Sequence, residues 1–125
     1  MNFIHAGLAA SSEENADRFF MDILGLEKSE PKYLDRKLSQ AIFGIDADLL
    51  IIHYRGRNID YEILVYEDYK VPEKQIAHSC IQVTSLKDIV NKCRTANLKV
   101  VEVQKSSGFI TFISDYDGNL FEMKE

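Results

Sequence analysis

Two stretches of the chain, NFIHAGLAAS at residues 2–11 and IAHSCIQVTS at residues 76–85, repeat one pattern and decide the fold. Each stretch carries one histidine, His5 or His78, in a loosely alternating apolar run that ends in serine. Alternation of this kind is typical of a β-strand, and a serine followed three residues later by an acidic residue is typical of a helix N-terminus. We therefore expect each half of the chain to begin with a strand that leads into a helix, with the two histidines at matching places.

The residues after each expected strand predict an amphipathic helix. In the first half, Ser11 and Glu14 form a capping box at the helix start, and Gly25 stands where a left-handed C-terminal cap is favoured. In the second half, Ser85 begins a weaker box, and Asn97 takes the position of the glycine. The apolar residues that recur at the spacing of one buried helical face are Ala16, Phe19, Phe20, Ile23 and Leu24 in the first half and Leu86, Ile89, Val90 and Cys93 in the second.

Three short runs rich in β-branched and aromatic residues end the second half. The runs LKVVEVQ (98–104), GFITFIS (108–114) and NLFEMKE (119–125) predict a three-stranded meander. The segment DYDG at 115–118 has the composition of a turn and joins the last two of these strands.

The first half offers a matching pair of strand-like runs. ADLLIIHYRG (47–56) and DYEILVYED (60–68) predict a hairpin that closes around Arg57 and Asn58. The segment 27–45 in front of them is less regular, and its LSQAIFGI part is compatible with a strand or with a helical turn.

Together these elements indicate one α+β domain of residues 1–125, built from two βαβββ modules. The first module covers about residues 1–69, the second about residues 76–125, and a polar linker, 70–75, joins them. The total length suits a single domain, and repetition over half of it indicates a duplication. Four strands and one crossover helix per module are expected to form curved mixed sheets around a central cleft, with the helices outside.

The composition indicates a globular protein and disfavours several classes of partner. Hydrophobic residues make up 46% of the chain and charged residues 28%, which is enough for a packed core. The net charge of -5 repels phosphate backbones, so no nucleic acid is expected. No apolar run approaches the roughly 20 residues that span a bilayer, and the start of the chain turns acidic where a secretion signal needs a basic flank. We therefore expect no membrane partner and a cytoplasmic location.

The two cysteines, Cys80 and Cys93, lack the CxxC spacing of a metal or redox motif. Both are expected to be free, buried thiols. A nucleophilic Cys80 is an alternative, because it lies two residues after His78 and so on the same strand face.

Four residues stand out as a candidate metal-binding set. His5 and His78 lie on the first expected strand of each half, and Glu62 and Glu122 lie on the last one. Imidazole nitrogens and carboxylate oxygens are the ligands that zinc, nickel, cobalt, iron and manganese accept. Alone, each histidine is compatible with a hydrogen-bonded core residue and each glutamate with an exposed strand edge. The fourfold match between the halves is what favours one bound divalent ion.

Three segments carry a resemblance that covers almost the whole chain. HAGLAASSEENADRFFMDILGLE (5–27), IAHSCIQV (76–83) and DYDGNLFEMKE (115–125) resemble the signature stretches of the glyoxalase, bleomycin-resistance and extradiol dioxygenase (vicinal oxygen chelate) superfamily. The resemblance implies the paired βαβββ fold. It also implies a metal site with histidine or glutamine on the first strand, glutamate on the fourth, histidine on the fifth and glutamate on the eighth. These positions correspond to His5, Glu62, His78 and Glu122.

The position of the first-half glutamate has an alternative. If ADLLIIHYRG were the fourth strand, Ile51 would stand at the ligand position, and His53, two residues along on the same face, would substitute for it. We prefer Glu62, because YEILVYED followed by the proline-containing linker resembles the family's usual approach to the second histidine.

The resemblance implies a metal-dependent lyase or isomerase, similar to lactoylglutathione lyase (glyoxalase I). The substrate would be a small hydroxycarbonyl compound or a thiol adduct of an aldehyde, which reacts through an enediolate-like intermediate. A glutamate near the ion can carry a proton between adjacent carbons, and Glu122 is our candidate, with Glu62 as its counterpart. Strand parity indicates Tyr66 and Cys80 as substrate-binding residues.

An alternative of another class is a metal-free protein that binds a drug or metabolite, similar to the bleomycin-resistance members. Extradiol dioxygenases belong to the same superfamily, and their iron site has two histidines and one glutamate. The four ligands expected here therefore disfavour a dioxygenase. Members of the family often dimerise, and the resemblance therefore allows a homodimer.

Overall fold

The structure is a computed structural model that describes residues 1–125. The chain divides into two compact units, Met1–Tyr69 (the first unit) and Lys70–Glu125 (the second unit). None of the helices has the length and apolarity that crossing a bilayer requires.

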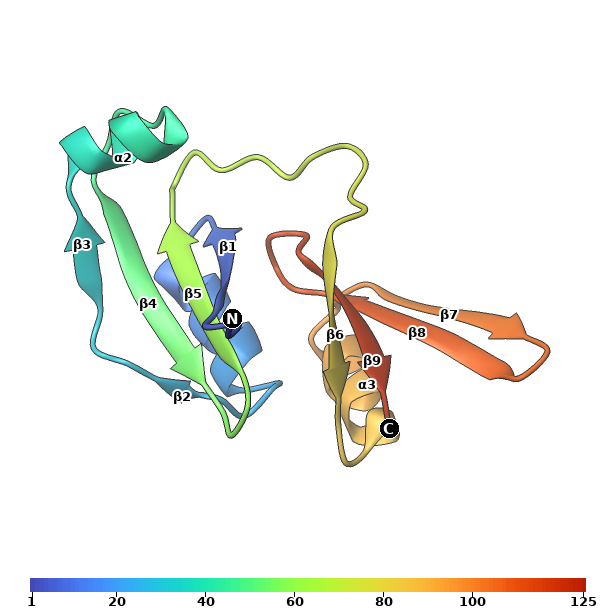
Figure 1. The fold of residues 1–125 in the computed structure, drawn as a ribbon. Coiled ribbons are helices and arrows are strands. Elements are labelled where there is room, and N and C mark those ends of the chain that lie inside the picture. Colours follow the sequence, from blue (N-terminus) through green and yellow to red (C-terminus); the bar gives the residue numbers. More distant parts are fainter. The chain divides into compact units, whose positions relative to one another are not determined.

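The second unit is a plain βαβββ module (Figure 1). In its four-stranded sheet the strand order is β6-β9-β8-β7, with β6 and β9 parallel and the remaining neighbours antiparallel. The last three strands form the meander that the sequence predicts. The elements are β6 (His78–Gln82), α3 (Leu86–Thr95), β7 (Val100–Lys105), β8 (Gly108–Ser114) and β9 (Leu120–Lys124).

The first unit has the same plan with one interruption. Its strand order is β1-β5-β4-β2, with β1 and β5 parallel, and β3 also pairs with β4. Two short strands thus occupy the edge that β7 occupies alone in the second unit. The elements are β1 (Ala6–Ala10), α1 (Glu13–Ala16), the π-helix η1 (Asp17–Met21), β2 (Glu27–Lys28), β3 (Lys32–Leu34), α2 (Arg36–Phe43), β4 (Leu49–Arg55) and β5 (Asp60–Val65).

The interruption explains the irregular segment 27–45 of the sequence. After β3 the chain forms the helix α2, so the helical interpretation of LSQAIFGI is the right one. Asp35 begins this helix, since its carboxylate accepts a hydrogen bond from the Leu38 N–H at 2.9 Å. Gly44 ends it in the left-handed conformation, with φ of 70°.

The helix caps agree with the sequence except at one position. Ser12, and not Ser11, is the first N-cap: its backbone is extended, and its hydroxyl accepts from the Asn15 N–H at 3.1 Å. Gly25 and Asn97 adopt the expected left-handed conformation, with φ of 69° and 57°. Ser85 caps α3 as predicted.

Packing of the first helix decides which face of the first sheet is free for polar residues. Phe20 and Tyr54 are fully buried and stack with ring centroids 5.1 Å apart, and Tyr61 lies 5.4 Å from the same phenylalanine. Tyr54 also donates a hydrogen bond to Asp17 at 2.6 Å, which ties β4 to η1. Because side chains alternate along a strand, His53 and Glu62 point to the opposite face of the sheet.

The second sheet alternates in the same way. Ile113 and Phe121 are fully buried, as is Cys93 of α3, and these residues belong to the core between helix and sheet. Phe112 and Glu122 therefore point to the face away from the helix.

Candidate metal centre

The first unit brings His5 and Glu62 together through the parallel pairing of β1 with β5. Gly7 is opposite Glu62 in this pairing, and His5 precedes Gly7 by two residues on the same face. His5 stands one residue before β1 begins, so the strand starts slightly later than the sequence indicates. The distance from His5 Nε2 to Glu62 Oε1 is 3.7 Å.

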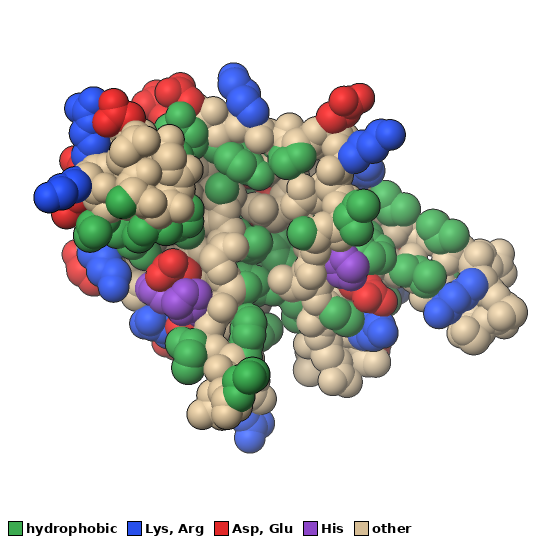
Figure 2. Space-filling model, turned by 45° about the horizontal axis from the view of Figure 1, so that its top comes forward, with side chains coloured by type: hydrophobic (Ala, Val, Ile, Leu, Met, Phe, Trp, Pro, Cys, Tyr) green, Lys and Arg blue, Asp and Glu red, His purple; other side chains and the backbone are tan.

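The second unit repeats this geometry with His78 and Glu122. Cys80 is opposite Glu122 in the parallel pairing of β6 with β9, and His78 again precedes the opposite residue by two positions. The distance from His78 Nε2 to Glu122 Oε2 is 3.9 Å. The two units therefore hold the same pair of residue types in the same register. Figure 2 shows histidine atoms beside acidic atoms at the surface of each unit.

The hydrogen bonding of His78 fixes which ring nitrogen carries the proton. Its Nδ1 lies 2.8 Å from the carbonyl oxygen of Ile76, and a carbonyl only accepts hydrogen bonds. Nδ1 is therefore the protonated nitrogen of the neutral ring, and Nε2 presents a lone pair toward Glu122. Ligand histidines in proteins usually have this arrangement, with one ring nitrogen on the metal and the other donating to a carbonyl or carboxylate.

A third histidine, His53, also lies against Glu62. It stands on β4 directly opposite Glu62 in the antiparallel pairing, and its Nε2 lies 3.3 Å from Glu62 Oε2. The His5 and His53 rings meet edge to face at 5.4 Å. The ligand atoms of these two histidines and Glu62 all lie within 4.8 Å of one another. His53 thus accompanies Glu62 and does not replace it, since β5, and not β4, pairs with β1.

Asp60 orients the His53 ring. Asp60 Oδ1 accepts from His53 Nδ1 at 2.6 Å, and its Oδ2 accepts from Arg55 Nε at 2.8 Å. Partial burial raises the pKa of Asp60, but the hydrogen bonds from Arg55 and His53 outweigh it and hold that pKa below its usual value. Asp60 is therefore an ionised acceptor at neutral pH.

The sequence contained a signal for this group that our interpretation did not use. A hairpin closed around Arg57 and Asn58 already places His53 opposite Glu62, and residue 55 opposite Asp60. Glu62 and His53, which the sequence offered as alternative ligands, thus belong to one cluster.

The second unit lacks the counterparts of His53 and Asp60. Phe112 is the residue opposite Glu122 on β8, and its ring lies 5.0 Å from the ring of His78. Glu122 has a different neighbour, because Lys124 Nζ lies 3.4 Å from Glu122 Oε1.

The proposed substrate-binding residues lie at the ends or edges of these strands. Tyr66 directly follows β5, is half-buried, and its N–H donates to the Ala10 carbonyl at 2.8 Å. Cys80 is exposed, which corrects the expectation of a buried thiol, whereas Cys93 is buried as expected. Desolvation and the charge of Glu122 raise the pKa of Cys80. A raised pKa disfavours the thiolate, so the structure gives no support to Cys80 as a nucleophile.

The donor set fits a divalent ion. Two donors at about 2.1 Å from one ion lie roughly 3.0 to 3.4 Å apart in octahedral or tetrahedral geometry. The separations of 3.3, 3.7 and 3.9 Å between histidine nitrogens and glutamate oxygens are close to this range, so small side-chain rotations suffice. A lone pair facing a carboxylate at such a distance is unfavourable unless a metal ion or a proton lies between them.

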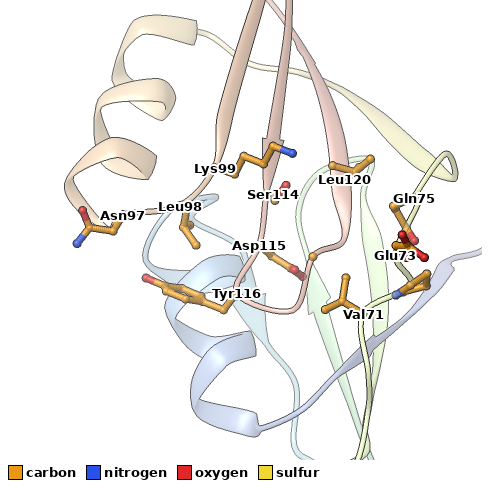
Figure 3. Close-up of a pocket in the computed structure, with 12 residues that line it drawn as sticks. Val71, Glu73, Gln75, Asn97, Leu98, Lys99, Ser114, Asp115, Tyr116 and Leu120 are labelled. Carbon is orange, nitrogen blue, oxygen red and sulfur yellow. The ribbon is translucent and has the colours of Figure 1, made fainter.

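The second unit also contains a cavity of about 500 Å³ that none of these residues line (Figure 3). Asp115 borders it, but the Asp115 carboxylate already accepts from the backbone N–H groups of Asp117 and Asn119, both at 2.9 Å, and from Asn119 Nδ2 at 2.7 Å. Burial raises the pKa of Asp115 to about 6. This carboxylate therefore holds the turn before β9, and the histidine and glutamate pairs are the better candidate for chemistry.

Solved structures of known proteins share the whole fold. A glyoxalase family protein from Enterococcus faecalis superposes with a TM-score of 0.75 at 17% identity, covering 99% of this chain and 97% of that one. The trypanothione-dependent glyoxalase I of Leishmania major gives 0.74 at 18% identity, covering 100% and 86%. This chain has the glyoxalase-like fold. A variant of the fosfomycin resistance protein FosX from Listeria monocytogenes, complexed with Mn(II) and a dihydroxypropylphosphonic acid, has the same fold, with a TM-score of 0.75 at 14% identity over 98% of this chain and 90% of that one.

By sequence, no protein-family model and no curated protein matches the chain. The likeness therefore lies in the three-dimensional structure. It confirms the α+β architecture of two βαβββ modules, since the glyoxalase-like neighbours span both units.

Proposed function

We propose that this protein is a metal-dependent lyase or isomerase that acts on a small hydroxycarbonyl compound or a thiol adduct of an aldehyde. In this proposal His5, Glu62, His78 and Glu122 are the ligands of one divalent ion, of zinc, nickel, cobalt, iron or manganese. The observation that carries the proposal is the repetition within each unit of a histidine Nε2 facing a glutamate oxygen, at 3.7 Å and at 3.9 Å.

The two glutamates have different surroundings, and these suit different roles. Glu62 is contacted by two imidazoles, so it is the more firmly held carboxylate. Glu122 has one histidine neighbour and an ammonium group, Lys124 Nζ, at 3.4 Å. With one imidazole neighbour where Glu62 has two, Glu122 is the less firmly held carboxylate, so it can more easily leave an ion to take a proton from a substrate carbon and return it to the adjacent one. We therefore assign proton transfer to Glu122, with Glu62 as its counterpart.

When bound, a divalent ion would supply electrostatic stabilisation of the negative charge that develops on the substrate oxygen. The chain's own residues then supply the orientation: the Ile76 carbonyl holds the His78 ring, and Asp60 holds the His53 ring. The fold's known members support this class of function, since FosX is described with manganese and glyoxalase I is an enzyme.

The proposal is tested with untagged protein, because the chain has only 3 histidines and a tag would mask them. Metal content after loading with zinc, nickel, cobalt, iron or manganese is measured by elemental analysis for the wild type and for His78→Ala and Glu62→Gln. We expect about one ion per chain in the wild type and clearly weaker binding in both variants. Glu67→Gln, an exposed glutamate outside the site, is the matched control and should bind like the wild type.

Activity is tested on the adduct of methylglyoxal with glutathione and with other thiols. Turnover that depends on added metal supports the lyase or isomerase. If the wild type binds no ion under any loading condition yet retains a small molecule, the protein is the metal-free binding protein of our alternative.

A further inference from the structure

His53 is a buried histidine on the free face of the first sheet, and the proposed set of four ligands does not use it. Its side chain is 11% exposed, whereas the His5 side chain is 36% exposed. A buried imidazole normally has both ring nitrogens satisfied, because an unpaired polar group is costly away from water. The partners of His53 therefore indicate what it binds.

One nitrogen of His53 has a strong partner and the other faces an acceptor. Nδ1 lies 2.6 Å from an oxygen of Asp60, and a carboxylate that is ionised only accepts, so Nδ1 carries the proton. Nε2 of the neutral ring then presents its lone pair to Glu62 Oε2 at 3.3 Å. Two acceptors at this distance repel each other unless a metal ion or a proton joins them, and the experiment below distinguishes the two.

We propose that His53 is itself a metal ligand, so that His5, His53 and Glu62 form a three-donor site for a divalent cation within the first unit. Asp60 is its positioning residue, and Arg55 fixes Asp60 in turn. The inference rests on the proposed function for His5 and Glu62, and it adds the third donor. A histidine whose second nitrogen donates to a carboxylate is the usual way in which proteins orient a ligand imidazole.

All three donors belong to the first unit: His53 lies on β4, Glu62 on β5, and His5 directly before β1. The geometry of this site therefore does not depend on the second unit. Their ligand atoms already lie within 4.8 Å of one another, with β4 and β5 in fixed register. The first unit alone thus offers three donors to a cation, whereas the second unit offers two, His78 and Glu122. Loss of His53 should consequently weaken binding at least as much as loss of His78.

The experiment uses the full, untagged chain titrated with Co²⁺, whose unpaired electrons shift the NMR signals of ligand protons. In the wild type we expect a strongly shifted ring N–H signal from His53, because its Nδ1–H is buried and held by Asp60 and so exchanges slowly. His53→Phe should remove this signal and lower the Co²⁺ affinity by at least about tenfold. Phenylalanine is chosen because Phe112 occupies the corresponding place in the second unit.

Two further variants separate ligation from packing. Asp60→Asn should lower affinity on the order of tenfold, and the double variant with His53→Phe should be no weaker than His53→Phe alone, because Asp60 acts through His53. His78→Phe should weaken binding but keep the shifted His53 signal. Thermal unfolding of the metal-free variants checks that each is folded.

The outcomes distinguish this inference from the function on which it rests. If the wild type binds no Co²⁺, the proposed function fails. If it binds Co²⁺, loses it in His78→Phe, and keeps both affinity and spectrum in His53→Phe, then only the inference fails, and His53 is a protonated bridge between Asp60 and Glu62.

Discussion

The two units hold the same histidine and glutamate in the same register but surround them differently. In the first, the residue opposite the glutamate is a histidine backed by Asp60; in the second it is Phe112, with no acid behind it. Parallel pairing of the first and last strands, which both units share, fixes the backbone of the pair. The side chains around the pair differ: β4 and β5 supply His53 and Asp60 in the first unit, where β8 and β9 have Phe112 and Leu120.

The largest expected effect separates the two glutamates. Glu122→Gln should reduce turnover by about 10²- to 10⁴-fold while leaving most metal bound, because the amide cannot accept the proton whereas His5, Glu62 and His78 remain as proposed donors. Glu62→Gln should act mainly through metal affinity, since two histidines face this carboxylate. Turnover is compared at saturating metal, with bound metal measured in the same samples. Equal losses of turnover and metal in both variants would contradict the division of roles.

The loops that join the last two strands form a second contrast between the units. The first unit uses the exposed turn around Arg57, whereas the second uses the buried Asp115. Burial raises the Asp115 pKa from 3.8 to about 6, so the folded state binds this proton more tightly than the unfolded state. The stabilisation is complete below pH 3.8 and is lost as the pH rises through about 6.

Asp115→Asn should therefore remove a pH dependence and leave the turn largely in place. The stability of the wild type relative to the variant should fall by about 3 kcal/mol as the pH rises from about 4 to above 6. Denaturant unfolding of both proteins at several pH values measures this difference. A difference that does not change with pH would show that the carboxyl of Asp115 does not titrate in this range.

The contrast between the units also shows what the sequence reveals of the fold. Strand alternation and the repeated histidine are local patterns, so they predicted the two modules and the strands on which the ligand candidates lie. The segment 27–45 was ambiguous because two short strands, β2 and β3, and the helix α2 follow one another there within a few residues. Asp35 and Gly44, which cap α2, are residue types that indicate the start and end of a helix. The first helix was placed one residue early, since Ser11 and Ser12 are both good caps and only backbone geometry chooses between them.

The cluster around His53 was missed for a different reason. Its members come together through pairing of strands, and pairing is not visible in the periodicity of one strand. The turn at Arg57 and Asn58 did contain the register, because a hairpin centred there sets His53 opposite Glu62. A residue-by-residue alignment of the two hairpins would have shown that His53 stands where the second unit has Phe112, and so that the first unit has one more candidate ligand.

A smaller effect is expected when the second unit is made to resemble the first. Phe112→His places an imidazole opposite Glu122, and Leu120 is the residue that corresponds to Asp60. Phe112→His with Leu120→Asp should therefore raise Co²⁺ affinity by about tenfold over Phe112→His alone, because only the double variant can orient the new ring. Isothermal titration of both variants measures the ratio. Equal affinities would mean that an acid at position 120 does not orient the ring.

The smallest effect concerns the helix-facing side of the same strands. Thr111 corresponds to Ile52 of the first unit, is only 2% exposed, and its hydroxyl has no hydrogen-bond partner. Thr111→Val replaces the hydroxyl with a methyl group of similar size, and a buried hydroxyl without a partner costs about 1 kcal/mol or more. The variant should thus be more stable by about 1 kcal/mol in denaturant unfolding, with metal affinity unchanged because this face is opposite to Glu122.

Ile52→Thr is the reciprocal control and should destabilise the first unit, since it introduces a hydroxyl into a core that has none at that position. A destabilised Thr111→Val variant would instead show that the Thr111 hydroxyl is satisfied, and that the helix-facing cores of the two units differ in polarity for a structural reason.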